Sequence, residues 1–171
     1  TLRKINGNSR VGDSDYFVIE ACEFVDSFLH SRHFVGTIQN IERDHLDYFT
    51  GGIEQIKESF KKFAKITPKD GLLVVNGDDK NVLDILDGLE CKIVKVGLSE
   101  NNDFVAKKIT YNELGKPRFD VYKNGEFYYH FELNIPGEHN VLNALSVVAV
   151  SDFFMIDKKI VNDSFKEFMG A

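Results

Sequence analysis

Short apolar runs alternate with helix-like segments in the first part of the chain, and this alternation limits the possible folds more than any other feature. Apolar residues recur at spacings of three and four from Ile53 to Phe63, which predicts an amphipathic helix packed on a sheet. A second helical face runs from Val82 to Leu89. Short strands that alternate with helices are typical of right-handed crossovers and a parallel sheet. We predict these strands at 17–19, 34–38, 72–75 and 93–96.

The pattern changes at 104–135, where apolar side chains alternate with a period of two near the end of the segment. Asn124-Gly125 is a strong signal for a two-residue hairpin turn. We therefore predict an antiparallel β subregion at 104–135, which Pro136-Gly137 brings to an end.

Two further helices are predicted after this hairpin region. One is largely apolar and covers 141–149, and the other follows Asp157, with Ile160, Phe165 and Phe168 expected to face the core. The predicted fold class is α/β, a mostly parallel sheet flanked by helices with a small antiparallel excursion. A length of 171 residues suits one domain, 1–171, with a full-sized core.

Composition and charge exclude several classes of function. The net charge of −6 argues against a duplex-binding protein, because binding to phosphates needs a clustered basic surface. No apolar run approaches the ~20 residues that span a bilayer, and the first residues do not resemble a signal peptide. Cys22 and Cys91 form no CxxC pattern, which fits a reducing cytosol and a cytoplasmic protein.

The first candidate for chemistry is Glu20, which follows the predicted strand at 17–19. Ligands of open α/β sheets bind outside the carboxyl ends of the strands, and a carboxylate there can coordinate a hard cation such as Mg²⁺. The alternative interpretation is an exposed acid at a strand end.

The second candidate is the polar segment 40–47, which also follows a predicted strand. Asn40, Asp44 and His45 belong to a dense set of metal-ligating groups in this segment. The alternative is a polar loop in which Asp44 or Asp47 caps the next helix. Mg²⁺ prefers oxygen ligands, so the chemistry of His45 alone does not name magnesium as its partner.

The third candidate is the segment 136–144, which starts a predicted helix. An Asn side chain can form two hydrogen bonds with the N6/N7 edge of adenine, and Asn140 is placed to read a free nucleotide in this way. The alternative is that Asn140 caps the helix while Asn143 faces solvent.

Motifs for other nucleotide and hydrolase sites are missing from the sequence. No GxxxxGK[ST] phosphate loop, GxGxxG or GxSxG occurs.

Taken together and in order, these segments resemble the Mur ligase family over nearly the whole chain. Each motif is weak alone, and the order and spacing make the set specific. The resemblance is carried by 20–23 with 27–29, by 40–42 with 44–47, by 71–79, and by Gly137, His139, Asn140, Asn143 and Ala144.

The resemblance implies an ATP-dependent ligase that forms an amide bond through an acyl phosphate. It implies ATP and Mg²⁺ as cofactors, with Glu20 and His45 as catalytic metal ligands. It also implies a nucleotide and phosphate pocket, with Asn140 on adenine. UDP-N-acetylmuramate and L-alanine are the implied substrates. One alternative is a related ligase that joins a muropeptide to the same acceptor, and another is a non-catalytic nucleotide-binding domain. The residues implied in the nucleotide pocket are Asn40, His139, Asn140 and Asn143.

The chain departs from the family pattern at several positions. Gln39 stands where a Thr is usual, and Arg43 replaces a small residue. Phe60 occupies the spacing expected for a carbamylated lysine, so no carbamate is assigned. The resemblance places the phosphate loop and a sugar-nucleotide domain upstream of residue 1, and an amino-acid-binding domain downstream of Ala171. The chain alone is therefore predicted to be inactive.

Overall fold

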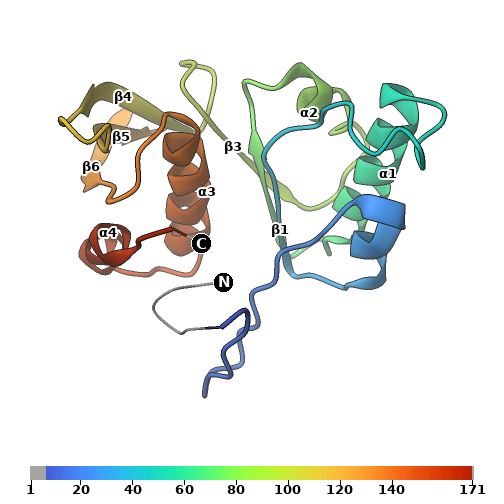
Figure 1. The fold of residues 1–171 in the computed structure, drawn as a ribbon, viewed down its shortest axis with the longest axis horizontal. Helices are drawn as coiled ribbons and strands as arrows, with labels where there is room; N and C mark the ends of the chain where they lie inside the picture. Colours follow the sequence, from blue (N-terminus) through green and yellow to red (C-terminus); the bar gives the residue numbers. More distant parts are fainter. Residues whose placement is uncertain (1–6, 171) are drawn as a thin grey trace.

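The computed structural model describes residues 7–170, and its centre is a six-stranded sheet. The strands follow the order of the sequence, and β1 to β4 are parallel while β4, β5 and β6 pair antiparallel (Figure 1). This confirms the predicted α/β class and the antiparallel region. The strands are β1 Val35–Ile38, β2 Leu72–Asn76, β3 Lys92–Gly97, β4 Phe104–Tyr111, β5 Pro117–Lys123 and β6 Glu126–Glu132.

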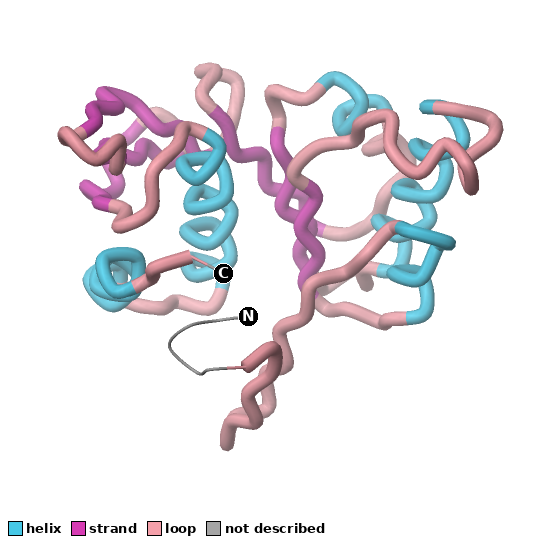
Figure 2. Tube along the Cα trace, in the orientation of Figure 1, coloured by secondary structure: helices cyan, strands magenta, loops and turns pink. Residues whose placement is uncertain are grey.

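Helices cover both faces of the parallel strands (Figures 1 and 2). α1 lies on one side together with a 3₁₀ segment, η2, while α3 packs on β2 and β3 from the other side. A short helix, α2, follows β2, and α4 packs against α3 and β6. The bounds are η2 Phe24–His30, α1 Ile53–Ile66, α2 Lys80–Asp84, α3 His139–Phe153 and α4 Lys158–Glu167.

β2 explains why the core has two parts. All five of its residues are buried, as expected for a central parallel strand that is covered on both faces. Leu72 and Val74 belong to the cluster under α3, and Leu73 and Val75 belong to the cluster under α1. Successive side chains of a strand point to opposite faces, so one run of apolar residues joins both clusters.

The hairpin between β5 and β6 has the predicted turn. Asn124 and Gly125 both have positive φ, at 51° and 84°, which fits the type I′ turn that an Asn-Gly pair favours. β4 continues the parallel sheet through pairing of Val96 with Phe104, so the antiparallel region is part of the same sheet.

The predicted strand at 17–19 is wrong for this structure. Phe17 and Val18 are 86% and 92% exposed, and no described strand pairs with this run. A run of three apolar residues becomes a strand only where a neighbouring strand satisfies its backbone hydrogen bonds. β1, the end strand of the sheet that the described residues form, pairs only with β2.

Two helical predictions were wrong in detail. In α4, Phe165 packs on the core as predicted, but Ile160 and Phe168 are 60% and 41% exposed, and the buried residue at the start of the helix is Val161. α2 ends at Asp84, so it covers only the beginning of the predicted face from 82 to 89. Among the described residues, no helix is long and apolar enough to cross a membrane.

Candidate functional site

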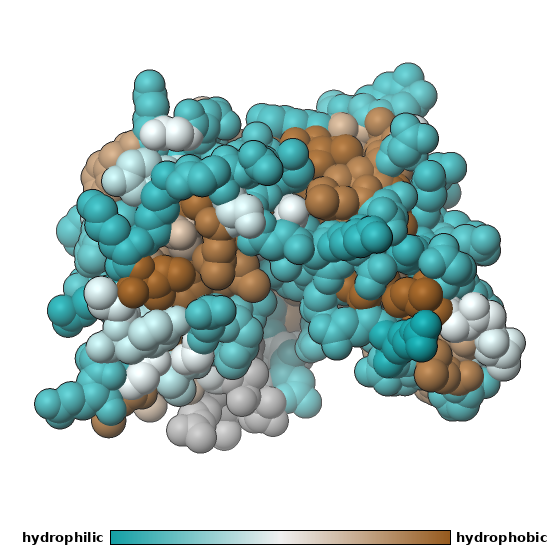
Figure 3. Space-filling model, turned by 90° about the horizontal axis from the view of Figure 1, so that it is seen from above, coloured by the Kyte–Doolittle hydropathy of each residue, from teal (hydrophilic) through white to brown (hydrophobic). Residues whose placement is uncertain are grey.

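Two of the polar segments singled out in the sequence, 40–47 and 136–144, lie at one edge of the sheet (Figure 1). β1, β2 and β3 end at this edge, and the N-terminal end of α3 points to it (Figure 1). The view onto this edge shows mostly hydrophilic side chains with separate hydrophobic patches (Figure 3). In open α/β folds this is the edge where ligands bind.

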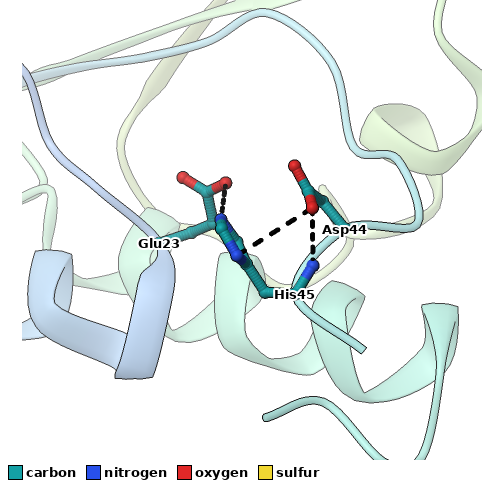
Figure 4. A group of neighbouring side chains, drawn as sticks. All are labelled: Glu23, Asp44 and His45. Carbon is teal, nitrogen blue, oxygen red and sulfur yellow. Dashed lines mark hydrogen bonds and ion pairs between the residues drawn. The ribbon is translucent and has the colours of Figure 1, made fainter. Parts of the chain in front are cut away.

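Glu23, Asp44 and His45 form a compact cluster at this edge (Figure 4). His45 Nε2 lies 3.5 Å from Glu23 Oε1, and His45 Nδ1 lies 3.9 Å from Asp44 Oδ1. One ligand atom from each side chain lies within 4.8 Å of the other two. Glu23 and His45 are partly buried, and Asp44 is exposed.

Two turns bring these side chains together. Glu23 precedes η2, and its carbonyl accepts a hydrogen bond from the backbone N–H of Asp26 at 3.0 Å. The carbonyl of His45 accepts hydrogen bonds from the N–H groups of Tyr48 and Phe49, both at 2.9 Å. Phe49 is buried and anchors the second turn in the core below α1.

The donor set fits a divalent cation. Two carboxylates suit a hard ion such as Mg²⁺ or Mn²⁺, and the imidazole of His45 can complete a mixed set of ligands. The backbone of His45 is left-handed, with φ of 50°, and its N–H donates to Asp44 Oδ1 at 2.7 Å. This bond fixes the carboxylate of Asp44 beside the ring.

The structure brings some of the predicted metal ligands together and not others. His45 is in the cluster, and Glu20 lies in an exposed loop outside it. The acid that meets His45 is Glu23, three residues further along. The sequence signal was present, since Glu23 is part of the same acidic motif, but the tight turn at 23–26 could not be read from spacing.

The predicted nucleotide residues lie at the start of α3. Asn140 Nδ2 donates to the carbonyl of Pro136 at 2.7 Å, and Asn140 Oδ1 accepts from Asn143 Nδ2 at 3.4 Å. The residue at the N-cap position is Glu138, so Asn140 is not the cap. His139 and Asn143 are exposed.

Asn40 lies in the loop after β1, at the same edge. Its side chain is exposed and donates to Glu42 Oε1 at 3.1 Å. The preceding Gln39 reaches across to α3, where its Nε2 donates to Ser146 Oγ at 2.6 Å. Gln39 Oε1 is buried and has no hydrogen-bond partner in the described part of the chain.

Asp78 and Asn102 form a hydrogen-bonded polar joint between the ends of β2 and β3, which was not predicted from the sequence. Asp78 accepts hydrogen bonds from the N–H of Leu98 at 2.5 Å and from Asn102 Nδ2 at 2.9 Å. Burial raises the pKa of Asp78, but these hydrogen bonds and those from Ser99 outweigh it and hold the pKa below its usual value. A Cβ on Gly77 would collide with the Asn102 side chain, which is buried and hydrogen-bonded to Asp78, so a larger residue at this position would disturb the joint.

The joint is connected to the candidate site through α2. Asn81 Nδ2 donates to the carbonyl of Ile41 at 2.8 Å, and Ile41 is fully buried three residues before Asp44. The cluster lies at the surface, since Asp44 is exposed and Glu23 and His45 are only partly buried. Two cavities of about 330 and 220 Å³ lie elsewhere and are lined by other residues.

Comparisons with known proteins agree with the architecture. A family model described as the Mur ligase middle domain matches residues 2–151. The UDP-N-acetylmuramate–L-alanine ligase of Caldanaerobacter subterraneus subsp. tengcongensis is 47% identical over 98% of this chain and 36% of its own length. The ligase of the same name from Clostridium acetobutylicum is 45% identical over the same shares. The chain therefore spans about a third of the length of these curated relatives.

Solved structures give the same result. UDP-N-acetylmuramate:L-alanyl-gamma-D-glutamyl-meso-diaminopimelate ligase from Neisseria meningitides matches with a TM-score of 0.73 and 27% identity, over 85% of this chain and 43% of its own. UDP-N-acetylmuramate-alanine ligase MurC from Thermotoga maritima matches with a TM-score of 0.71 and 26% identity, over 85% and 31%.

Proposed function

The chain belongs to the Mur ligase family, and we propose that it is the ATP-handling middle domain of an enzyme that joins L-alanine to UDP-N-acetylmuramate in peptidoglycan precursor synthesis. The observation that carries the proposal is 47% identity over 98% of the chain to a ligase with that name. Further relatives at 45% and 44% identity carry the same name, which makes muropeptide recycling the weaker candidate.

The proposed reaction has two steps. The carboxylate of UDP-N-acetylmuramate attacks the γ-phosphorus of ATP, ADP leaves, and an acyl phosphate forms. The amino nitrogen of L-alanine then attacks the acyl carbon, phosphate leaves with the bonding electron pair, and the nitrogen loses a proton. Phosphoryl transfer of this kind depends on positioning and on neutralising charge.

Glu23, Asp44 and His45 are the residues that we propose as cation ligands on the basis of geometry. Glu20 remains a proposed ligand because of its place in the family-like motif at 20–23. It lies on the segment that leads to Glu23. A bound Mg²⁺ supplies charge neutralisation at the phosphates. The carboxylates alone repel a triphosphate, so the proposal requires the cation for ATP to approach this edge.

Asn140 is proposed to contact adenine, with His139 and Asn143 beside it and Asn40 near the phosphates. An amide has two donor hydrogens and two acceptor lone pairs. The bonds to Pro136 and Asn143 use one of each, so Asn140 keeps one donor and one acceptor. That pair matches the N7 acceptor and N6 donor of adenine.

The proposed location is the bacterial cytoplasm. Cys22 and Cys91 are both free thiols, which fits a reducing compartment.

A domain graft tests the proposal. Residues of the Caldanaerobacter ligase that align with this chain are replaced by it, and ADP release is measured with UDP-N-acetylmuramate and L-alanine. We expect activity that depends on both substrates. His45→Ala in the graft should lower the rate at least about 10–100-fold, because loss of a residue that only orients a metal ligand already costs that much. His30→Ala is the matched control, because His30 is exposed and has no proposed role.

Two results would contradict the proposal. One is a folded graft that binds UDP-N-acetylmuramate but releases no ADP. The other is a graft in which His45→Ala and His30→Ala have equal rates.

A further inference from the structure

Asp26 connects the two turns of the cluster and belongs to neither the proposed ligand set nor any sequence motif discussed above. Its carboxylate accepts a hydrogen bond from the Tyr48 hydroxyl at 2.8 Å and another from the Ser59 hydroxyl. Ser59 is buried on α1, and Tyr48 lies in the loop after β1. One side chain therefore ties the segment that carries Glu23 to two other elements.

The hydrogen bonds of Asp26 lie close in sequence to the contact between Glu23 and His45. Asp26 lies three residues after Glu23, and Tyr48 lies three residues after His45. The carbonyl of His45 accepts a hydrogen bond from the Tyr48 N–H. The ring of Phe24 lies between the two turns, with centroids 4.8 Å from His45 and 6.5 Å from Tyr48. Loss of the Asp26 bonds would leave the Glu23 turn attached mainly by ring contacts.

The backbone at this turn needs such an anchor. Val25 and Asp26 have φ of 50° and 57°, and His45 has φ of 50°. Left-handed conformations cost L-residues about 1–2 kcal/mol each, and they are unusual for a β-branched residue such as Val25. Residues in such conformations persist where their surroundings hold them, and they cluster at functional sites.

We propose that Asp26 is a positioning residue that holds Glu23 against His45 through Tyr48 and Ser59, and so sets the affinity of the cluster for a divalent cation. The inference rests on the proposed function for the cation, but the positioning itself can be measured without one.

Asp26 could instead act on the site only through its charge, as one more acid nearby. Tyr48→Phe separates these effects, because it removes one bond to Asp26 and leaves every charge in place. Glu58→Gln is the charge-matched control, since Glu58 is an exposed acid next to Ser59 on α1.

The first measurement is the nuclear Overhauser effect between the Phe24 and His45 rings in the metal-free chain. We expect it in the wild type and in Glu58→Gln, and we expect it to weaken strongly in Asp26→Ala and partly in Tyr48→Phe. Unchanged amide shifts in β4–β6 show that each variant remains folded. An effect that persists unchanged in Asp26→Ala would overturn the inference.

The second measurement is Mn²⁺ affinity, followed by electron paramagnetic resonance of the free ion. We expect Asp26→Ala to weaken binding about 10-fold, as for other residues that orient a metal ligand. Tyr48→Phe should weaken it less, and Glu58→Gln should change it less than about twofold because surface charges are screened. Equal losses in Asp26→Ala and Glu58→Gln would show a charge effect and contradict positioning. A wild type that binds no Mn²⁺ but shows the ring contact, lost in Asp26→Ala, would contradict the proposed cation site and leave the positioning role supported.

Discussion

The parallel and antiparallel halves of the sheet differ in where each strand finds its partner. β4, β5 and β6 are consecutive and pair across short turns, whereas β1, β2 and β3 pair across the segments that contain α1 and α2. The proposed cation ligands all lie in loops next to the parallel half. The antiparallel half, which short turns specify, thus carries none of these ligands. The parallel half, whose strands pair across long segments, provides the site.

The largest expected effect tests whether the two halves share one core. Phe131 on β6 is fully buried and contacts Phe119, Tyr129 and Phe165. Phe131→Ala should lower the free energy of unfolding by about 3–5 kcal/mol. Urea unfolding should show one transition for probes in both halves, because one core cluster includes residues of β2 and β6.

Phe127→Ala on the same strand is the control, and its exposed side chain should make the cost small. Separate transitions for the His45 region and β6 would mean that the halves are independent units.

The next effect concerns the joint between β2 and β3. Asp78→Asn should cost about 1–3 kcal/mol at neutral pH, because hydrogen bonds to a charged acceptor become weaker or are lost. The pKa of Asp78 is lowered in the folded state, so its contribution is present above the unfolded pKa and is lost as pH falls through the folded value. The difference between the two proteins should therefore shrink in acid, and a constant difference in urea titrations from pH 7 to pH 3 would refute this account.

A smaller effect is expected at the hairpin turn of the antiparallel half. Gly125 has φ of 84°, and Gly125→Ala should cost about 1–2 kcal/mol because an L-residue is strained there. Gly12→Ala provides the comparison, since Gly12 has open space around it and no left-handed backbone. Equal thermal stability of the two variants would mean that the local turn does not specify this half.

The smallest effect is expected in the run before the site. Val18→Asp should change the free energy of unfolding by less than about 0.5 kcal/mol, because Val18 is 92% exposed. A loss above about 1 kcal/mol in urea unfolding would mean that 17–19 packs as the strand that the sequence predicted.

These differences explain how much the sequence could predict. The Asn124-Gly125 turn, the buried run of β2 and the apolar spacing of α1 depend on local patterns, and all three predictions are confirmed. The strand at 17–19 failed because an apolar run needs a neighbouring strand, which no local pattern can show. Glu23 was not selected over Glu20 for a related reason, since the turn that aims it depends on Asp26 and on residues more than twenty positions away.

The proposed divalent cation site at the carboxyl edge of the sheet consists of Glu23, Asp44 and His45. Paramagnetic broadening of the amide resonances of this chain by substoichiometric Mn²⁺ would locate the bound ion. We predict that residues 23–26 and 44–48 broaden first, and that His45→Ala removes this selectivity. First broadening around a different acidic group, where Asp120 and Glu132 flank His130 on β5 and β6, would contradict a cation site at Glu23, Asp44 and His45.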